Sequence, residues 1–438
     1  MKPFNIVPGL RLRGRIILPG DKSIAHRALI LSAISPGVTT LNNFPSSEDL
    51  KATISIFTKL GVKIKSSGKG MVIVSGRGLN GLKEPREGLF IAESGTTFRL
   101  LLGVLAGQNF GVKVLAGKSL SRRPMLRVTE PLRGMGAFVK SRRSGQDEYP
   151  PVFIKGGRLR GITYRVPVAS AQVKSAIILA GLYAEGKTRV IEPVKTRDHT
   201  ERMLKFFKAG IQHKGNTIVM KRTMSLVSPG RFYVPGDLSS ASFFVVASII
   251  LPGSRLVLKD VSLNPTRTGL LKVLKRMGAD INIAKKCRRV SGFEPSGDLE
   301  VTSSKLKATK VTQEEIPSLI DELPILMVAS CFAKGKTVLE GVGELRVKET
   351  DRIRSMTENL NKMGADIRII RHKLKENMFI QGVEGLKGAA LKSFGDHRTA
   401  MSLMIAGLSA CGRSRIDDVS CVNKSFPGFA NSMQSLLG

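Results

Sequence analysis

The sequence predicts an α/β protein of two domains in which helices are buried and sheets face solvent, an inside-out form of the usual α/β barrel. Three observations lead to this prediction. One plan repeats six times along the 438 residues, at intervals of about 70 to 80 residues. The first helix of each repeat is apolar on nearly all sides, whereas the strands alternate apolar and charged residues. A chain of this length exceeds one ordinary core, so two domains of roughly 200 residues are expected.

Each repeat opens with polar or charged residues where a helix should begin. An apolar stretch rich in small residues follows each opening, such as residues 28–34 after the first. Because a helix N-terminus carries a partial positive charge, six such ends could converge on one anionic ligand. The openings are Asp21–Arg27, Glu93–Thr97, Ser170–Lys174, Gly236–Ser240, Asp321–Pro324 and Gly395–Arg398.

A glycine and a strand follow most of the apolar helices, as in Gly111–Leu115. A second helix then closes at a glycine that suits the residue just beyond a helix end, as at Gly61, Gly278 and Gly364. Another strand begins directly after that glycine. The repeating unit is therefore strand, helix, strand, helix and strand, with an extra strand in places. An ordinary sandwich with its helices outside is the alternative.

Two stretches rich in Pro and Gly, Val227–Gly230 and Val234–Asp237, separate the first three repeats from the last three. A second crossing is expected near residues 18–21 if the first strand belongs with the C-terminal half. The predicted domains are residues 21–234, and residues 1–20 together with 235–438. Two such connections would form a hinge.

The composition narrows the classes of function. The net charge is +36, with 70 Lys and Arg against 34 Asp and Glu, which suits nucleic acid, a membrane surface or anionic small molecules. There is no Trp and only 4 Tyr, so aromatic platforms for bases are scarce. No apolar stretch is long enough for a membrane span, and residues 1–20 lack the apolar segment of a signal peptide. Four cysteines make no disulfide framework, so we expect a cytoplasmic protein.

Several helix starts carry groups suited to anions. Lys22 and Arg27 lie one turn apart beside Ser23, which we expect to cap its helix. Lys174 would add an ammonium group near Ser170 and Gln172. Lys348 and Arg352 are four residues apart, so both would face a ligand from one helix. Each motif alone is more often a cap or a solvated surface, but their joint placement favours a ligand site.

Two further groups complete this set. Arg123 precedes Pro124, and its guanidinium could bind a carboxylate or a phosphate. Asp321 opens a buried helix and would be a helix cap first and a general base second.

These segments, taken in order, resemble the EPSP synthase family, the 3-phosphoshikimate 1-carboxyvinyltransferases. The resemblance extends from residue 18 to residue 429 and has motifs in every repeat. The matching segments are LPGDKSIAHRALILSAIS, ESGTTFRLL, RRPM, SAQVKSAIILAGL, TRDHTE, GDLSSASFF, DELPILMVASCFAKG, LRVKETDRI, GDHRTAMS and NKSFPGF.

The resemblance implies two domains of three βαβαββ units each, with helices inside. It implies transfer of the enolpyruvyl group of phosphoenolpyruvate to the 5-hydroxyl of shikimate 3-phosphate, with release of phosphate. The product leads to chorismate and the aromatic amino acids. The family needs no metal or organic cofactor, and we expect a monomer with these two small-molecule partners, no nucleic acid and no membrane.

The resemblance also assigns residues. Asp321 is the implied base for the hydroxyl, Glu349 the acid and base for carbon, and Lys22 a proton-transfer and charge-stabilising group. The implied contacts of shikimate 3-phosphate are Lys22, Ser23, Arg27, Ser170, Gln172, Asp321 and Lys348. The implied contacts of phosphoenolpyruvate are Lys22, Gly95, Arg123, Gln172, Arg352, Arg398 and Lys424.

Two positions depart from the family pattern, since Glu93 and Glu344 stand where relatives often carry Asn. A carboxylate at Glu93 is expected to repel phosphoenolpyruvate unless a cation neutralises it. The nearest alternative function is an enolpyruvyl transferase acting on UDP-N-acetylglucosamine. Those enzymes commonly use a Cys on the loop that corresponds to Leu115–Arg123, which has none here. A basic nucleic-acid-binding protein is the alternative of another class.

Overall fold

The computed structural model describes residues 3–9, 11–68, 70–287, 293–372 and 375–438. These residues form two compact units. The N-terminal unit consists of Lys22–Val234 with Phe293 and Glu294, and the C-terminal unit consists of the other described residues. Among the described residues, no helix is both long enough and apolar enough to cross a membrane.

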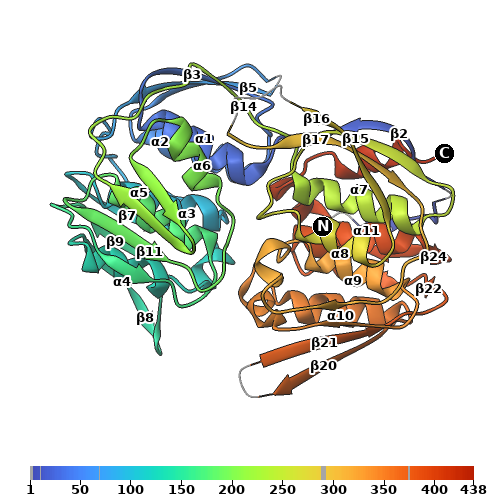
Figure 1. Ribbon diagram of the computed structural model, residues 1–438. Coiled ribbons are helices and arrows are strands. Elements are labelled where there is room, and N and C mark those ends of the chain that lie inside the picture. Colours follow the sequence, from blue (N-terminus) through green and yellow to red (C-terminus); the bar gives the residue numbers. More distant parts are fainter. Residues whose placement is uncertain (1–2, 10, 69, 288–292, 373–374) are drawn as a thin grey trace. The chain divides into compact units, whose positions relative to one another are not determined.

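Three buried helices form the centre of the N-terminal unit (Figure 1). They are α1 (Lys22–Ala33), α3 (Gly95–Leu105) and α5 (Ala171–Gly181). A Cβ added to Gly103 would lie 2.2 Å from the Ala176 carbonyl oxygen, so the missing side chain lets α3 and α5 approach closely. The second helices of these repeats expose one face and are α2 (Glu48–Lys59), α4 (Leu126–Gly134) and α6 (His199–Phe206).

In the described part of this unit, each repeat contributes to one four-stranded sheet. In each sheet the first two strands are parallel and the other pairs antiparallel. The first sheet has the order β14 (Arg231–Tyr233), β3 (Pro36–Asn42), β5 (Met71–Arg77) and β4 (Lys63–Ser66). The second has β6 (Leu89–Phe90), β7 (Gly111–Leu115), β9 (Asp147–Lys155) and β8 (Phe138–Ser144). The third has β10 (Thr163–Arg165), β11 (Lys187–Ile191), β13 (Thr217–Lys221) and β12 (Ile211–Lys214).

The C-terminal unit repeats this layering. Its buried helices are α7 (Leu238–Ile250), α9 (Leu323–Cys331) and α11 (His397–Leu408). Its other helices are α8 (Gly269–Arg276), α10 (Arg352–Lys362) and the terminal α12 (Phe429–Gln434). Short 3-10 turns occur in both units: η1 (Leu120–Arg122), η2 (Ile316–Ser318), η3 (Val342–Val347) and η4 (Ser420–Lys424).

Two four-stranded sheets of this unit keep the same pattern, but the last repeat has shorter strands. The expected first strand, β2, pairs parallel with β15 and so joins the C-terminal half. The first sheet is β16 (Asp280–Cys287), β17 (Ser296–Thr302), β15 (Arg255–Ser262) and β2 (Arg13–Ile17). The second is β18 (Lys310–Val311), β19 (Lys336–Leu339), β21 (Lys375–Gln381) and β20 (Asp366–His372). The last repeat has β1 (Phe4–Ile6), β25 (Ser414–Ile416) and β23 (Ala390–Leu391), with β22 (Leu386–Lys387) beside β24 (Ala410–Cys411).

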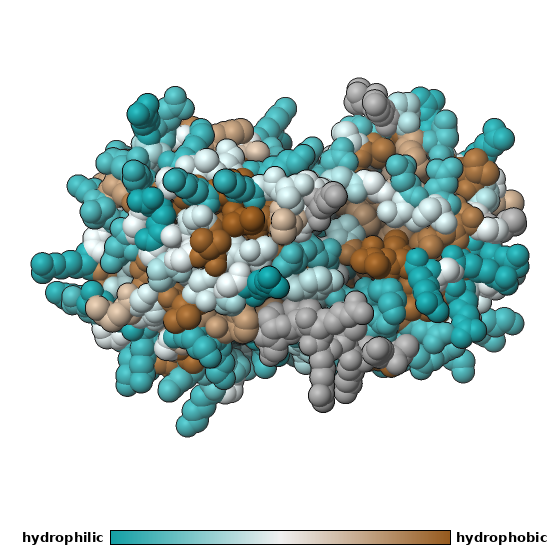
Figure 2. Space-filling view, turned by 90° about the horizontal axis from the view of Figure 1, so that it is seen from above, coloured by the Kyte–Doolittle hydropathy of each residue, from teal (hydrophilic) through white to brown (hydrophobic). Residues whose placement is uncertain are grey.

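These layers confirm the predicted fold class, with buried helices and outer sheets. The strand pattern explains the layering, because β9 alternates buried and exposed residues from Pro150 to Lys155. Hydrophilic side chains cover most of the face in Figure 2, with hydrophobic patches between them. Phe138 and Phe153 are exposed on one sheet, where their rings meet edge to face at 6.1 Å.

The two segments where the chain passes between the units pair with each other inside the C-terminal unit. The Asp21 N–H donates to the Pro235 carbonyl at 2.7 Å, and the Asp237 N–H to the Pro19 carbonyl at 3.0 Å. The buried Arg267 donates to a carboxylate oxygen of Asp21 at 2.8 Å and lies 3.5 Å from one of Asp237. One guanidinium therefore contacts both crossing segments.

Candidate active site

The predicted site residues fall into two groups, one in each unit. In the N-terminal unit, some of these residues lie at the start of α1. The helix begins at Lys22, so Ser23 belongs to its first turn and the prediction that Ser23 is the N-cap is wrong. The Lys22 ammonium donates to Asp49 Oδ2 at 2.9 Å. Asp49 comes from the neighbouring α2, and the sequence analysis missed it because helix contacts of this kind leave no local signal.

Arg27 joins three helices of this unit. It is buried, and its Nε donates to Thr200 Oγ1 at 2.7 Å while Nη2 donates to Ser175 Oγ at 3.1 Å. Its Nη1 donates to the Ser23 carbonyl at 2.9 Å. These contacts fix the first turn of α1 against α5 and α6.

The start of α3 lies beside two guanidinium groups. Ser94 caps the helix, with its hydroxyl accepting from the Thr97 N–H. A Cβ added to Gly95 would lie 2.8 Å from Arg123 Nη1 and 3.2 Å from Arg99 Nη1. A helix N-terminus flanked by two cations suits a carboxylate or a phosphate.

Arg99 connects this helix start to that of α5. Its Nη1 donates to Gln172 Oε1 at 2.5 Å, and Gln172 Nε2 donates to Thr96 Oγ1 at 2.9 Å. The structure therefore brings Gly95, Arg123 and Gln172 together. The sequence analysis missed Arg99, because its place in an apolar helix gave no sign that the side chain reaches the helix start.

Of the other residues predicted at the start of α5, Ser170 lies at the helix start and Lys174 does not. Ser170 is the N-cap, with its hydroxyl accepting from the Val173 N–H at 3.4 Å. Lys174 points into the core, where its ammonium lies 3.0 Å from Glu192 and 2.7 Å from Glu201. The expectation that Lys174 adds a cation to the helix start is therefore wrong. A buried ammonium needs paired carboxylates, and two meet it here.

In the C-terminal unit, Arg352 gathers three carboxylates. It is 1% exposed and donates to Asp396 Oδ2 at 2.9 Å, Glu349 Oε2 at 2.5 Å and Asp321 Oδ1 at 3.4 Å. Burial alone would lower the pKa of Arg352, but the three carboxylates outweigh it and raise that pKa. Asp321, the predicted base for the hydroxyl, and Glu349, the residue predicted to exchange a proton with a substrate carbon, thus share one buried guanidinium.

Arg398 and Lys424 lie at the start of α11 in the same cluster. Arg398 Nη1 donates to the Asp321 carbonyl at 2.9 Å, and Nη2 lies 3.7 Å from its carboxylate. Asp396 caps α11, accepting from the Arg398 N–H at 2.7 Å. Lys424 Nζ donates to the Gly395 carbonyl at 3.2 Å. Asp321 itself precedes Glu322, the N-cap of α9, so its predicted capping role is wrong.

The segment before Arg352 is not the helix that its charge spacing suggested. The helix α10 begins at Arg352 with Asp351 as its cap, and Lys348 lies between η3 and α10. Lys348 and Arg352 therefore do not share a helix face. Arg346 instead pairs with Asp351 and Glu376, and its hydrogen bond is the largest cause that lowers the pKa of Glu376 to about 2. Glu344 lies within η3.

Residues 6–433 match the family model described as EPSP synthase (3-phosphoshikimate 1-carboxyvinyltransferase). The chain belongs to the EPSP synthase family. It is 48% identical over 436 residues to the 3-phosphoshikimate 1-carboxyvinyltransferase of Petrotoga mobilis, and the match covers 99% of each chain. It is 46% identical over 438 residues to the protein of that name from Citrifermentans bemidjiense, covering 100% of each.

Solved structures agree with this family assignment. An EPSP synthase from Acinetobacter baumannii is 41% identical and has a TM-score of 0.87, covering 100% of this chain and 98% of that one. The enolpyruvyl transferase NikO from Streptomyces tendae is 17% identical with a TM-score of 0.75, which shows the fold alone. Membership of the EPSP synthase family favours the 3-phosphoshikimate 1-carboxyvinyltransferase reaction over transfer to UDP-N-acetylglucosamine.

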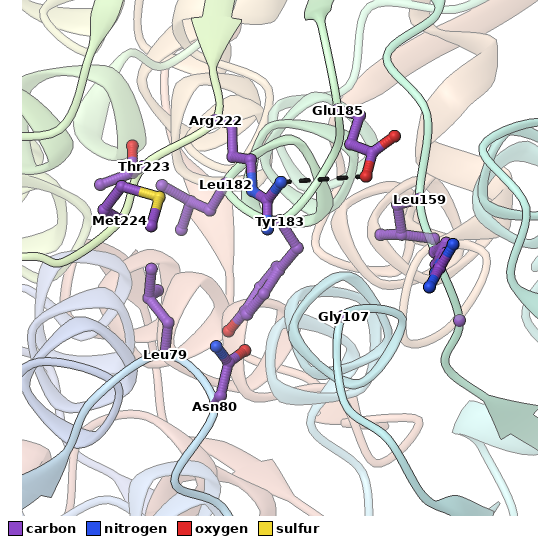
Figure 3. A pocket seen from close by; sticks show the side chains of 12 residues that line it. Leu79, Asn80, Gly107, Leu159, Leu182, Tyr183, Glu185, Arg222, Thr223 and Met224 are labelled. Atoms are coloured by element: carbon purple, nitrogen blue, oxygen red, sulfur yellow. Dashed lines mark ion pairs between the residues drawn. The ribbon is translucent and has the colours of Figure 1, made fainter.

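A separate cavity of about 190 Å³ lies in the N-terminal unit (Figure 3). It lies at the C-terminal ends of α3 and α5, beyond Gly107 and Tyr183, whereas the predicted site of this EPSP synthase family member uses their N-terminal ends. Glu185 and Arg222 form an exposed ion pair at its edge, 3.9 Å apart. In the described part of the chain, no three His, Cys, Asp or Glu side chains are grouped as a metal site requires.

Proposed function

We propose that this chain transfers the enolpyruvyl group of phosphoenolpyruvate to the 5-hydroxyl of shikimate 3-phosphate, forming 5-enolpyruvylshikimate 3-phosphate and phosphate for aromatic amino-acid biosynthesis. The observation that carries this conclusion is the EPSP synthase match over residues 6–433. The cluster of Asp321, Glu349 and Arg352 supports it, because the reaction requires carboxylates for proton transfer beside cations for anionic substrates.

The substrates explain the composition of the proposed site. Together they carry two phosphates and two carboxylates, so a binding site must supply several cations and helix N-termini. The proposed phosphoenolpyruvate contacts are Lys22, Gly95, Arg123, Gln172, Arg352, Arg398 and Lys424. The proposed shikimate 3-phosphate contacts are Lys22, Ser23, Arg27, Ser170, Gln172, Asp321 and Lys348. These residues come from two proposed enolpyruvyl transferase domains, residues 21–234 and residues 1–20 with 235–438.

The chemistry assigns separate roles to the acids. Asp321 accepts the proton of the 5-hydroxyl while the hydroxyl oxygen attacks C2 of phosphoenolpyruvate. In the same step C3 of phosphoenolpyruvate takes up a proton. The C2–O bond to phosphate then breaks. Because the product keeps a C2–C3 double bond, C3 must lose a proton again, and one group can act first as acid and then as base. We assign that group as Glu349, with Lys22 aiding proton transfer and stabilising the negative charge.

We also propose that the enzyme acts as a monomer in the cytoplasm, with no nucleic-acid or membrane partner. Cys331, Cys411 and Cys421 carry free thiols in the described part of the chain, which suits a reducing compartment. Sedimentation of the purified protein at several concentrations tests the monomer, and a mass that rises to twice that of the chain would contradict it.

The initial rate of phosphate release tests the proposed activity. Purified enzyme is mixed with phosphoenolpyruvate and shikimate 3-phosphate, with UDP-N-acetylglucosamine as the competing acceptor in a parallel reaction. Of the two acceptors, we expect only shikimate 3-phosphate to give phosphate release. Release with the nucleotide sugar, or with neither acceptor, would overturn the proposal.

A further inference from the structure

The Glu93 carboxylate lies against the loop that leads to Arg123. Its Oε2 accepts from the Leu120 N–H at 2.8 Å, and its Oε1 accepts from the Ser119 N–H at 3.2 Å. These two N–H groups belong to the start of η1, and Arg123 follows the end of that short turn. The carboxylate that was expected to repel an anion therefore accepts two backbone hydrogen bonds.

The loop is shaped to admit this carboxylate. A Cβ added to Gly117 would lie 2.4 Å from Glu93 Oε1, so only a glycine leaves room for the side chain there. The Gly117 N–H donates to the Ala92 carbonyl at 2.6 Å, beside Glu93 in the chain. The loop and the strand end before α3 are thus held together at several points.

The same loop sets the position of Arg123. The Ser121 N–H donates to the Gly117 carbonyl at 2.9 Å, and the Arg123 N–H donates to the Leu120 carbonyl at 3.0 Å. These bonds link the residues bound by Glu93 to the backbone of Arg123. The Arg123 guanidinium then reaches the start of α3, where Nη1 lies 2.8 Å from the Cβ position of Gly95.

We propose that Glu93 is a positioning residue for phosphoenolpyruvate, because it holds the loop that places Arg123 beside the start of α3. The inference rests on the proposed function, in which Arg123 binds that substrate. A carboxylate suits this role because each of its two oxygens takes one N–H, and hydrogen bonds to a charged acceptor are stronger than neutral ones. A side-chain amide offers one acceptor oxygen only.

Glu93→Gln distinguishes positioning from repulsion, because positioning predicts a higher KM for phosphoenolpyruvate in the variant and repulsion predicts a lower one. The variant keeps the side-chain length but turns an NH2 group toward one backbone N–H. We expect KM for phosphoenolpyruvate to rise roughly 10-fold, the size of one lost charge-assisted hydrogen bond. KM for shikimate 3-phosphate should stay within about twofold. An unchanged or lowered KM for phosphoenolpyruvate would overturn the inference.

Glu87→Gln is the matched control, because Glu87 is exposed and the substitution changes the charge equally. We expect it to leave both KM values unchanged. A rise in KM for phosphoenolpyruvate equal to that of Glu93→Gln would mean that net charge, and not the loop, sets the affinity. That result would also overturn the inference.

Combining Glu93→Gln with Arg123→Ala tests whether Glu93 acts through Arg123. If it does, Glu93→Gln changes KM for phosphoenolpyruvate by less than about twofold in the Arg123→Ala background. Full additivity would contradict positioning through Arg123. If Arg123→Ala alone leaves this KM unchanged, the proposed site fails together with the inference. If Arg123→Ala raises it and Glu93→Gln does not, the inference alone fails. Thermal unfolding of each variant shows whether the fold is retained.

Discussion

At the scale of single residues, Arg352 organises the acids of the C-terminal unit. Asp321, Glu349 and Asp396 all contact its buried guanidinium. Asp396 also caps α11, so its carboxylate has a structural task, whereas Asp321 and Glu349 are partly exposed. This difference in exposure is consistent with proton-transfer roles for Asp321 and Glu349, the roles that the family resemblance implies, and not for Asp396.

Glu349→Gln is expected to reduce kcat by about 100-fold or more, the usual contribution of a general acid or base. The amide oxygen can still accept from Arg352, so binding of substrates and the fold should be retained. Steady-state phosphate release measures kcat, and circular dichroism checks the fold. A kcat within about twofold of the wild type would remove Glu349 from the proton-transfer role.

Gly95→Ala is expected to raise KM for phosphoenolpyruvate several-fold, with a smaller effect on kcat. The new methyl group would lie 2.8 Å from Arg123 Nη1, so the guanidinium must move. Gly134→Ala is the matched control, because a Cβ there meets nothing within 4 Å. Equal KM values for wild type and Gly95→Ala would show that Arg123 moves without loss to the site.

At the scale of elements, the sequence predicted the repeats, the buried helices and the glycines that end the second helices, since Gly61, Gly278 and Gly364 all have positive φ. These features repeat locally, so polar openings before apolar stretches and glycines after them were sufficient. Exact helix starts were not predictable, because tertiary contacts decide whether a helix begins at Lys22 or two residues later, at Ile24. This uncertainty of one or two residues explains the wrong roles given to Ser23 and Asp321.

The ion-pair partners of charged side chains could not be predicted from the sequence either. Lys174 pairs with Glu192 and Glu201, which follow it by 18 and 27 positions; Glu192 comes just after β11 and Glu201 lies on α6. Asp49 meets Lys22 only because α2 packs against α1. A list of motifs gives the chemical groups of a site, but folding decides which of them face a ligand.

Asp237, the N-cap of α7, is expected to make a pH-dependent contribution to stability. Burial raises the pKa of Asp237 from 3.8 to about 6, with Asp21 adding to the rise and Arg267 and Arg398 opposing it. The folded state therefore binds this proton more tightly than the unfolded chain. The contribution of Asp237 to stability is fully present below the unfolded pKa and is lost as the pH rises through about 6.

Asp237→Asn removes this titration, and Asn caps helices about as well as Asp. We expect the Tm of the variant, relative to wild type, to be more favourable at about pH 7.5 than at about pH 4. The exposed Asp280→Asn serves as the control and should give the same difference at both pH values. A Tm difference for Asp237→Asn that does not change with pH would contradict the raised pKa.

At the scale of the whole molecule, the charge of +36 favours anionic ligands of every kind. We expect the KM of both substrates to rise with NaCl between about 0.05 and 0.5 M, while kcat changes little, because salt screens attraction at a distance. A series of initial rates measures this. A KM that does not depend on salt would show that contacts within the site outweigh the field of the whole protein.

The central claim is the transfer itself, and identification of the product tests it most directly. Phosphorus NMR and mass spectrometry of a reaction with phosphoenolpyruvate and shikimate 3-phosphate should show 5-enolpyruvylshikimate 3-phosphate and inorganic phosphate in equal amounts. Neither should form when one substrate or the enzyme is omitted. Phosphate without the enolpyruvyl product, or no reaction with enzyme that circular dichroism shows to be folded, would contradict the account.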